Sequence, residues 1–230
     1  MKELNKKFLA GVLATLTLAA STVVSVAYAE VGASVGASNM YYWRGYDLGY
    51  GDPAIWGDIN VSGSGAYAGM WASSGDSTAG TEYDLYFGYG HEFGDFGLDI
   101  SYWTYSYPSA TSTSYVYSPV DDSVTEVTED ASVDPGDLAE IVLGLSYGPV
   151  ALTYYHGIED LEDYWYATLE ATVADFTFKY GKHETDYAHF DITYAYNDNL
   201  SFTLGTVVDD LDGTENDNPK FVVNLTLPIE

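Results

Sequence analysis

The sequence contains no cysteine and few basic residues. Lys and Arg together number 7, against 35 Asp and Glu, in a chain of 230 residues. Without cysteine, an exported chain must hold its fold without disulfides. The formal charge of −28 disfavours binding to nucleic acid or to anionic lipid surfaces and favours cations near the protein. Beyond the N-terminal region no segment approaches 18 uninterrupted apolar residues, so no transmembrane helix is predicted there.

The N-terminus has the pattern of a secretory signal peptide. A lysine-rich region precedes an apolar run from Phe8 to about Val26, and an Ala-Tyr-Ala cleavage site ends at Ala29. We therefore predict a signal peptide over residues 1–29 and a single exported all-β domain over residues 30–230. An uncleaved membrane anchor is the alternative interpretation, because the apolar run is nearly long enough to span a bilayer.

Most of the chain alternates apolar and polar residues with a period of two. In TEYDLYFGYGHEF, for example, Leu85 and Phe87 fall on one face and Asp84 falls on the other. A helix cannot sort this pattern, but a β-strand with one apolar and one wet face does. About 12 strands are predicted, with 10 possible because two segments are poorly sorted. The segments are 31–44, 53–61, 65–73, 81–92, 96–107, 137–147, 149–157, 163–173, 176–185, 187–196, 200–208 and 219–228.

The connections between these segments alternate between tight turns and longer polar loops. The longest loop, residues 108–136, is acidic and rich in Ser and Thr, and we expect a mobile external loop. Short turns at one end and long loops at the other are typical of an antiparallel up-and-down transmembrane β-barrel of the bacterial outer membrane. The apolar faces would then meet lipid and the polar faces would line the lumen. A soluble lipocalin-like or jelly-roll barrel, with its apolar face inward, is the competing interpretation.

Arg44 is the only arginine, and it stands at the end of the first predicted strand. By the alternation of this strand, Tyr41 and Trp43 would face lipid near the outer interface, and Arg44 would face the lumen. There it would pair with an acid such as Asp58 or Glu82. The pair would either brace a constriction or only close a network of lumen ion pairs.

Carboxylates outnumber bases on the predicted lumen face. The excess predicts a porin for passive diffusion of small solutes that prefers cations, because acidic side chains concentrate cations and repel anions. The predicted channel lining consists of Arg44, Asp58, Glu82, Asp84, Asp99, Glu140, Glu170, Lys179 and Asp191. A plugged or narrow barrel with a structural or surface-interaction role is the alternative. It is favoured by large aromatic residues that would crowd the lumen, Tyr42, Trp56, Tyr86 and Trp103.

No pattern of catalytic residues stands out. The histidines lie in no Gly-x-Ser-x-Gly setting, so no enzymatic activity, catalytic residue or cofactor is predicted. His183 and His189 flank a short loop, but two metal ligands without a third favour a surface or girdle position over a metal site. The acidic segment 209–218 lacks the spacing of a calcium loop. It is predicted to be a solvated loop that bridges lipopolysaccharide through divalent ions.

Two segments resemble the TorF family of proteobacterial porins, long described as conserved proteins of unknown function. They are SNMYYWRGYDLGYGDPAIWGDINVSGSGAYAGMWASS, residues 38–74, and EYDLYFGYGHEFGDFGLDISYWTYSYP, residues 82–108. The resemblance implies a porin of the cell outer membrane without an established solute. It implies outer-membrane lipid, lipopolysaccharide, small solutes or cations, and the barrel-assembly machinery as partners. Two features depart from the family: Trp56 replaces a polar residue such as Gln, and the C-terminal FVVNLTLPIE lacks the usual terminal aromatic.

Overall fold

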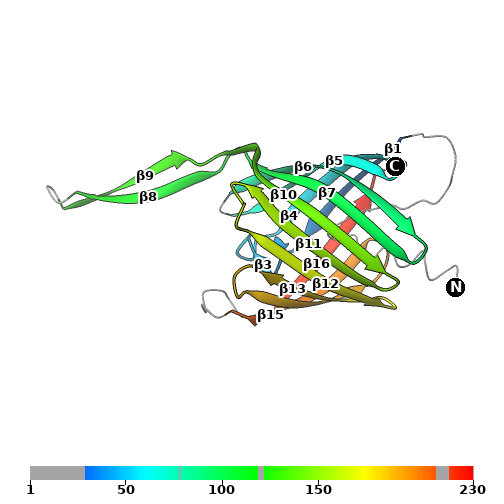
Figure 1. Cartoon of the computed structure of the whole chain (residues 1–230). Coiled ribbons are helices and arrows are strands. Elements are labelled where there is room, and N and C mark those ends of the chain that lie inside the picture. The colour runs from blue at the N-terminus through cyan, green and yellow to red at the C-terminus, as the bar shows by residue number, and fades with distance from the viewer. Residues whose placement is uncertain (1–28, 78, 119–121, 211–217, 230) are drawn as a thin grey trace.

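The chain forms a closed barrel of twelve antiparallel strands (Figure 1). The structure is a computed structural model that describes residues 29–77, 79–118, 122–210 and 218–229. The predicted antiparallel barrel and its strand count are confirmed. The barrel strands are β1 (Glu30–Ser38), β4 (Ala54–Gly63), β5 (Ala66–Asp76), β6 (Gly80–Phe93), β7 (Phe96–Tyr107), β10 (Val133–Tyr147), β11 (Val150–Glu159), β12 (Trp165–Val173), β13 (Phe176–His183), β14 (Ala188–Ala195), β15 (Leu200–Asp209) and β16 (Lys220–Pro228).

Each barrel strand pairs with its neighbours in chain order, and β1 closes the ring by pairing with both β4 and β16. Tight turns join β4 to β5, β6 to β7, β10 to β11, β12 to β13 and β14 to β15 at one end of the barrel, as the sequence predicts. At the other end the connections from β1 to β4, β7 to β10 and β15 to β16 are long, but the loop predicted over residues 74–80 is short, because β5 extends to Asp76 and β6 begins at Gly80. No helix among the described residues has the length and hydrophobicity needed to cross a membrane.

The outer surface of the barrel carries the apolar side chains. In β6, Leu85 and Phe87 are 40 % and 59 % exposed, whereas the alternating Glu82 and Asp84 are 3 % and 4 % exposed inside the barrel. A soluble barrel would show the reverse arrangement, with its apolar residues packed inward. The distribution is that of a barrel surrounded by lipid.

The long connection over residues 108–136 differs from the expected mobile loop. β8 (Thr111–Ser118) and β9 (Ser123–Asp130) pair as a two-stranded ribbon, and the ribbon extends far from the barrel (Figure 1). Its residues include Thr, Val and Tyr, which favour extended backbone and outweigh the acidic composition on which the loop was predicted. Residues 1–28 of the predicted signal peptide lie outside the described residues, so the signal peptide stays a prediction.

The predicted first strand is wrong at its C-terminal end. β1 ends at Ser38, and within residues 39–53 the chain turns into the lumen, where β2 (Tyr42–Trp43) pairs with β3 (Tyr46–Asp47). We call residues 39–53 the inward hairpin. The prediction that Tyr41 and Trp43 face lipid is therefore also wrong, since the alternation of β1 does not continue past its last residue. Tyr41 is buried at 8 % exposure and Trp43 is half-buried.

Candidate functional site

The tip of the inward hairpin is a two-residue turn formed by Arg44 and Gly45. Their φ angles are 48° and 93°, and a type I′ turn requires positive φ at both central positions. Gly45 is also pressed against the barrel wall, because a Cβ atom there would lie 2.8 Å from the His189 ring and 2.9 Å from the Tyr187 ring. The turn thus depends on glycine both for its backbone conformation and for its close approach to the wall between β13 and β14.

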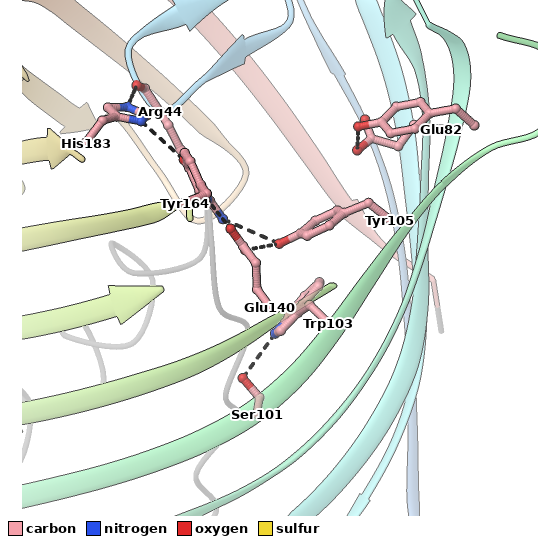
Figure 2. Close-up of polar contacts among 9 residues, drawn as sticks. Arg44, Glu82, Ser101, Trp103, Tyr105, Glu140, Tyr164 and His183 are labelled. Carbon is pink, nitrogen blue, oxygen red and sulfur yellow. Dashed lines mark hydrogen bonds and ion pairs between the residues drawn. The ribbon is translucent and has the colours of Figure 1, made fainter. Parts of the chain in front are cut away.

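Arg44 forms a two-pronged ion pair with Glu140 of β10 (Figure 2). Its Nη1 and Nη2 atoms donate to the two carboxylate oxygens of Glu140, each at 2.7 Å, and Tyr105 of β7 donates to the same carboxylate. The side chains of Arg44 and Glu140 are 7 % and 1 % exposed. The predicted partners of Arg44, Asp58 and Glu82, are wrong because the hairpin carries the guanidinium across the lumen to the opposite wall.

Aromatic rings surround the Arg44 guanidinium. Its central carbon lies 4.4 Å from the ring centroid of Trp43, 4.2 Å from that of Tyr155, and 5.0 Å from that of Tyr166. At these distances a guanidinium is attracted by the ring faces. Burial lowers the pKa of Arg44, but the hydrogen bonds with Glu140 and the electrostatic interactions with Glu140, Tyr105 and Tyr164 together outweigh this effect and raise the pKa well above its ordinary value. The hairpin tip therefore carries a permanent positive charge.

His183 anchors the backbone of the hairpin tip. Its Nε2 atom lies 2.9 Å from the carbonyl oxygen of Arg44, which only accepts hydrogen bonds, so the proton belongs on Nε2. The Nδ1 atom lies 3.2 Å from the hydroxyl of Tyr164. Burial raises the pKa of Tyr164 to about 12, so this hydroxyl is protonated at neutral pH and donates to Nδ1. The Tyr164 oxygen in turn accepts from Arg44 at 2.9 Å, which closes a ring of hydrogen bonds (Figure 2).

A second histidine supports the same wall. The Nδ1 atom of His189 lies 3.0 Å from Asp191, and its Nε2 atom lies 2.8 Å from the hydroxyl of Tyr166. Tyr42 of the hairpin donates to Asp191 at 2.7 Å. The prediction of a surface or girdle position is wrong for both histidines, since His183 and His189 are 2 % and 1 % exposed and lie inside the barrel.

On the opposite side of the hairpin, two tyrosines satisfy Glu82. Tyr41 donates to one oxygen of this carboxylate, and Tyr107 of β7 donates to the other at 2.7 Å. Asp84 is two residues further along β6 on the same inner face. Its buried Oδ1 atom has no hydrogen-bond partner among the described residues.

The other predicted lumen residues lie inside the barrel, further from the hairpin tip or beside its base. Asp58 accepts from Tyr86, Asp99 accepts from Tyr67, and Glu170 pairs with Lys179 at 3.3 Å. All of these side chains are half-buried. The structure therefore places all nine predicted residues on the inside, and it divides them between the hairpin level and the part of the barrel nearer the tight turns.

Two predicted lumen aromatics also lie inside the barrel, where Trp103 is the cross-strand partner of Glu140. The indole nitrogen of Trp56 donates to Asn224 at 3.4 Å. The ring of Trp103 stacks on Tyr86 with centroids 4.3 Å apart. Aromatic side chains thus occupy part of the lumen, as the alternation of β4 and β7 indicates.

Several residues that hold the hairpin were not predicted. Tyr105, Tyr155 and Tyr166 have the alternation of the lumen face, but only the position of Arg44 shows that they surround a cation. Tyr164 lies in the loop between β11 and β12, where no alternation of apolar and polar residues predicts the direction of its side chain. Within the described parts of the chain, no group of three or more His, Cys, Asp and Glu residues is arranged to hold a metal ion.

The barrel resembles two solved outer-membrane structures from Escherichia coli. The match to outer membrane phospholipase A has 10 % identity and a TM-score of 0.40, and covers 96 % of this chain and 98 % of that chain. The match to outer membrane protease OmpT has 12 % identity and a TM-score of 0.26, and covers 87 % and 93 %. At such identities a likeness concerns the fold alone.

The prediction that the chain is not an enzyme is contradicted by these matches, because both solved proteins are named as enzymes. At identities of 10 % and 12 %, neither enzyme's reaction can be assigned to this chain.

A search of curated proteins gives no match. A family model does match, over residues 25–203 of the 230, and its description is bacterial protein of unknown function (Gcw_chp). Since the match includes both the inward hairpin and most of the barrel strands, the chain belongs to the Gcw_chp family.

Proposed function

We propose that this protein is an outer-membrane channel for passive diffusion of small solutes, that it prefers cations, and that the inward hairpin constricts its lumen. The observation that carries the proposal is the charge of the inner face. Seven carboxylates lie there, Asp58, Glu82, Asp84, Asp99, Glu140, Glu170 and Asp191, together with two bases, Arg44 and Lys179.

Ion pairs engage both bases, so the charges that remain unpaired among these nine residues are all negative. Arg44 is neutralised by Glu140 and Lys179 by Glu170, so seven minus two leaves five inner carboxylates without a Lys or Arg partner. A lumen with low-dielectric walls focuses the field of such charges and raises the local concentration of cations. Anions meet no unpaired lysine or arginine among these nine residues. This supports selection by charge sign in addition to selection by size.

The same proposal assigns the protein to the TorF type of porin and to the cell outer membrane after removal of a signal peptide. The apolar outer surface supports contact with outer-membrane lipid, and the longer connections would meet lipopolysaccharide. Insertion would depend on the barrel-assembly machinery despite the missing terminal aromatic. Most of the acidic segment 209–218, proposed to bridge lipopolysaccharide, lies outside the described residues.

Conductance of the refolded mature chain in planar bilayers tests the proposal. We expect stable single-channel steps and, under a salt gradient, a reversal potential of the sign that cation selectivity gives. A variant with residues 39–53 replaced by a short Gly-Ser connection should show larger steps, because the constriction is gone. Absence of conductance from both chains, with folding verified by heat-modifiable mobility in gels, would contradict the channel.

A plugged barrel with a structural role is the second candidate. It is favoured by the way the hairpin is fixed to the wall in three directions, by Arg44 to Glu140, by Tyr41 to Glu82 and by Tyr42 to Asp191. The same pair of chains distinguishes the two functions. A silent wild type with a conducting hairpin-replacement variant would favour the plug over a permanently open channel.

A further inference from the structure

Asp84 differs from the two other carboxylates that lie deepest at the hairpin level. Glu140 accepts hydrogen bonds from Arg44 and Tyr105, and Glu82 accepts from two tyrosines. Asp84 is equally buried, at 4 % exposure, but its Oδ1 atom is enclosed without a hydrogen-bond partner. The inner face thus holds one carboxylate whose binding capacity the described residues do not use.

An ionised carboxylate is costly to bury unless it is paired or hydrogen-bonded. The charges that act on Asp84 are those of Glu82, Glu140 and Arg44. Arg44 already gives both terminal nitrogens to Glu140, so it does not compensate Asp84 through a hydrogen bond. Three carboxylates therefore share one guanidinium, and a cation bound beside Asp84 would offset the repulsion among them.

The neighbours of Asp84 define the size of the ligand that fits. Its cross-strand partners are Trp71 on β5 and Tyr105 on β7, two bulky rings on the same face. The oxygens of Glu82 and Glu140 are engaged by tyrosines and arginine, so Asp84 is the uncommitted acidic ligand among these three described carboxylates. A divalent ion such as calcium needs several carboxylate or carbonyl oxygens. One carboxylate between aromatic walls suits a small monovalent cation.

We infer that Asp84 is a binding site for a small monovalent cation, an alkali ion or ammonium, at the level of the inward hairpin. The inference rests on the proposed function, because it names the position in the constriction at which the cation preference arises. A permeating cation would lose part of its hydration shell and bind the Asp84 carboxylate beside the hairpin. Anions would be repelled at the same point by the combined charge of Asp84 and Glu82.

Thermal unfolding tests the site without requiring conductance. Unfolding midpoints of the refolded mature chain in detergent are measured in potassium chloride and, at equal ionic strength, in N-methyl-D-glucamine chloride, whose cation is too large for the site. We expect a saturable rise of the midpoint that is specific to potassium, because a ligand that binds only the folded state stabilises it. If potassium raises the wild-type midpoint no more than the bulky cation does, the inference is overturned without reference to any variant.

Asp84→Asn should lose the potassium-specific rise, since it keeps the shape of the side chain but removes the charge. Asp99→Asn is the matched control, because Asp99 also faces the lumen but is hydrogen-bonded to Tyr67. This control should keep the rise. In planar bilayers, Asp84→Asn should lower the cation-to-anion permeability ratio more than Asp99→Asn does.

The outcomes separate this inference from the proposed function. Cation-selective conductance with equal behaviour of Asp84→Asn and Asp99→Asn in both measurements overturns the site and leaves the channel intact. A potassium-specific rise that depends on Asp84, in a chain that never conducts, supports the site and contradicts the channel. Infrared spectra add a third test: a carbonyl band of a protonated carboxylic acid that disappears in Asp84→Asn and does not respond to potassium would show a neutral Asp84 and overturn the inference.

Discussion

The two parts of the lumen, at the level of the inward hairpin and nearer the tight turns, use the same residue types in different ways. At the hairpin level Glu82 and Glu140 are 3 % and 1 % exposed and are bonded to groups that the hairpin carries. Nearer the turns Asp99 is half-buried and accepts a hydrogen bond from Tyr67 of the barrel wall itself. At the hairpin level, carboxylates of the inner face thus hold the inward hairpin. Nearer the tight turns, they line a more accessible wall.

The difference has an energetic consequence. A buried ion pair that loses one member leaves an uncompensated charge in a medium of low dielectric constant. A partly exposed pair that loses one member leaves a charge that water still reaches, so the loss is small. Substitutions in the two parts should therefore differ in their effect on stability more than in their effect on ion selectivity.

The largest expected effect belongs to the Arg44→Met substitution. It leaves Glu140 buried without its cation and removes the contacts with Trp43 and Tyr155. We expect the free energy of unfolding in urea to fall by about 3–5 kcal/mol. We also expect a larger conductance, because the hairpin tip is released from β10.

The control for this prediction is the double substitution Arg44→Met with Glu140→Leu. Replacing both members of a buried pair by apolar groups removes the uncompensated charge, so the double variant should be more stable than Arg44→Met alone. A double variant that loses the sum of the two single losses would show that Arg44 and Glu140 act independently, contrary to the geometry of the pair.

The next largest effect concerns the turn itself, and two glycines with similar backbones separate its two causes. Gly45 and Gly51 have φ angles of 93° and 87°, but a Cβ atom on Gly51 meets nothing within 4 Å. Gly51→Ala should cost about 1 kcal/mol from the backbone alone. Gly45→Ala should cost about 1–3 kcal/mol more, because its Cβ collides with the rings of His189 and Tyr187. Urea unfolding of both variants measures the difference, and equal losses would contradict the close packing of the hairpin tip.

The comparison also shows what the sequence could and could not predict. Wherever a strand crosses the whole barrel, the period of two assigns the side chains correctly, and Glu140, Lys179 and Asp191 lie on the predicted inner face. The tight turns lie where predicted because Gly, Asn and Asp mark them. These features depend on local patterns, so a single sequence contains them.

The inward hairpin could not be predicted by the same means. Arg-Gly is a weak signal for a type I′ turn, which usually has Asn-Gly or Asp-Gly, and the aromatic residues before it continue the alternation of β1. The contact of Arg44 with Glu140 joins positions 96 residues apart and depends on where the barrel wall lies in space. The same holds for Tyr164 and His183, whose roles depend on the hairpin and not on their own strands.

The smallest effect on stability is expected for Glu170→Gln, in the ion pair with Lys179. The two side chains are 13 % and 19 % exposed, and Lys179 keeps a second acidic neighbour because it is also paired across strands with Asp191. We expect a loss of about 1 kcal/mol in urea unfolding. In planar bilayers the reversal potential should shift toward lower cation selectivity, since Lys179 then carries a less compensated positive charge at the lumen wall. A loss of stability as large as that of Arg44→Met, with no change in reversal potential, would show that both parts of the lumen serve only to hold the barrel together.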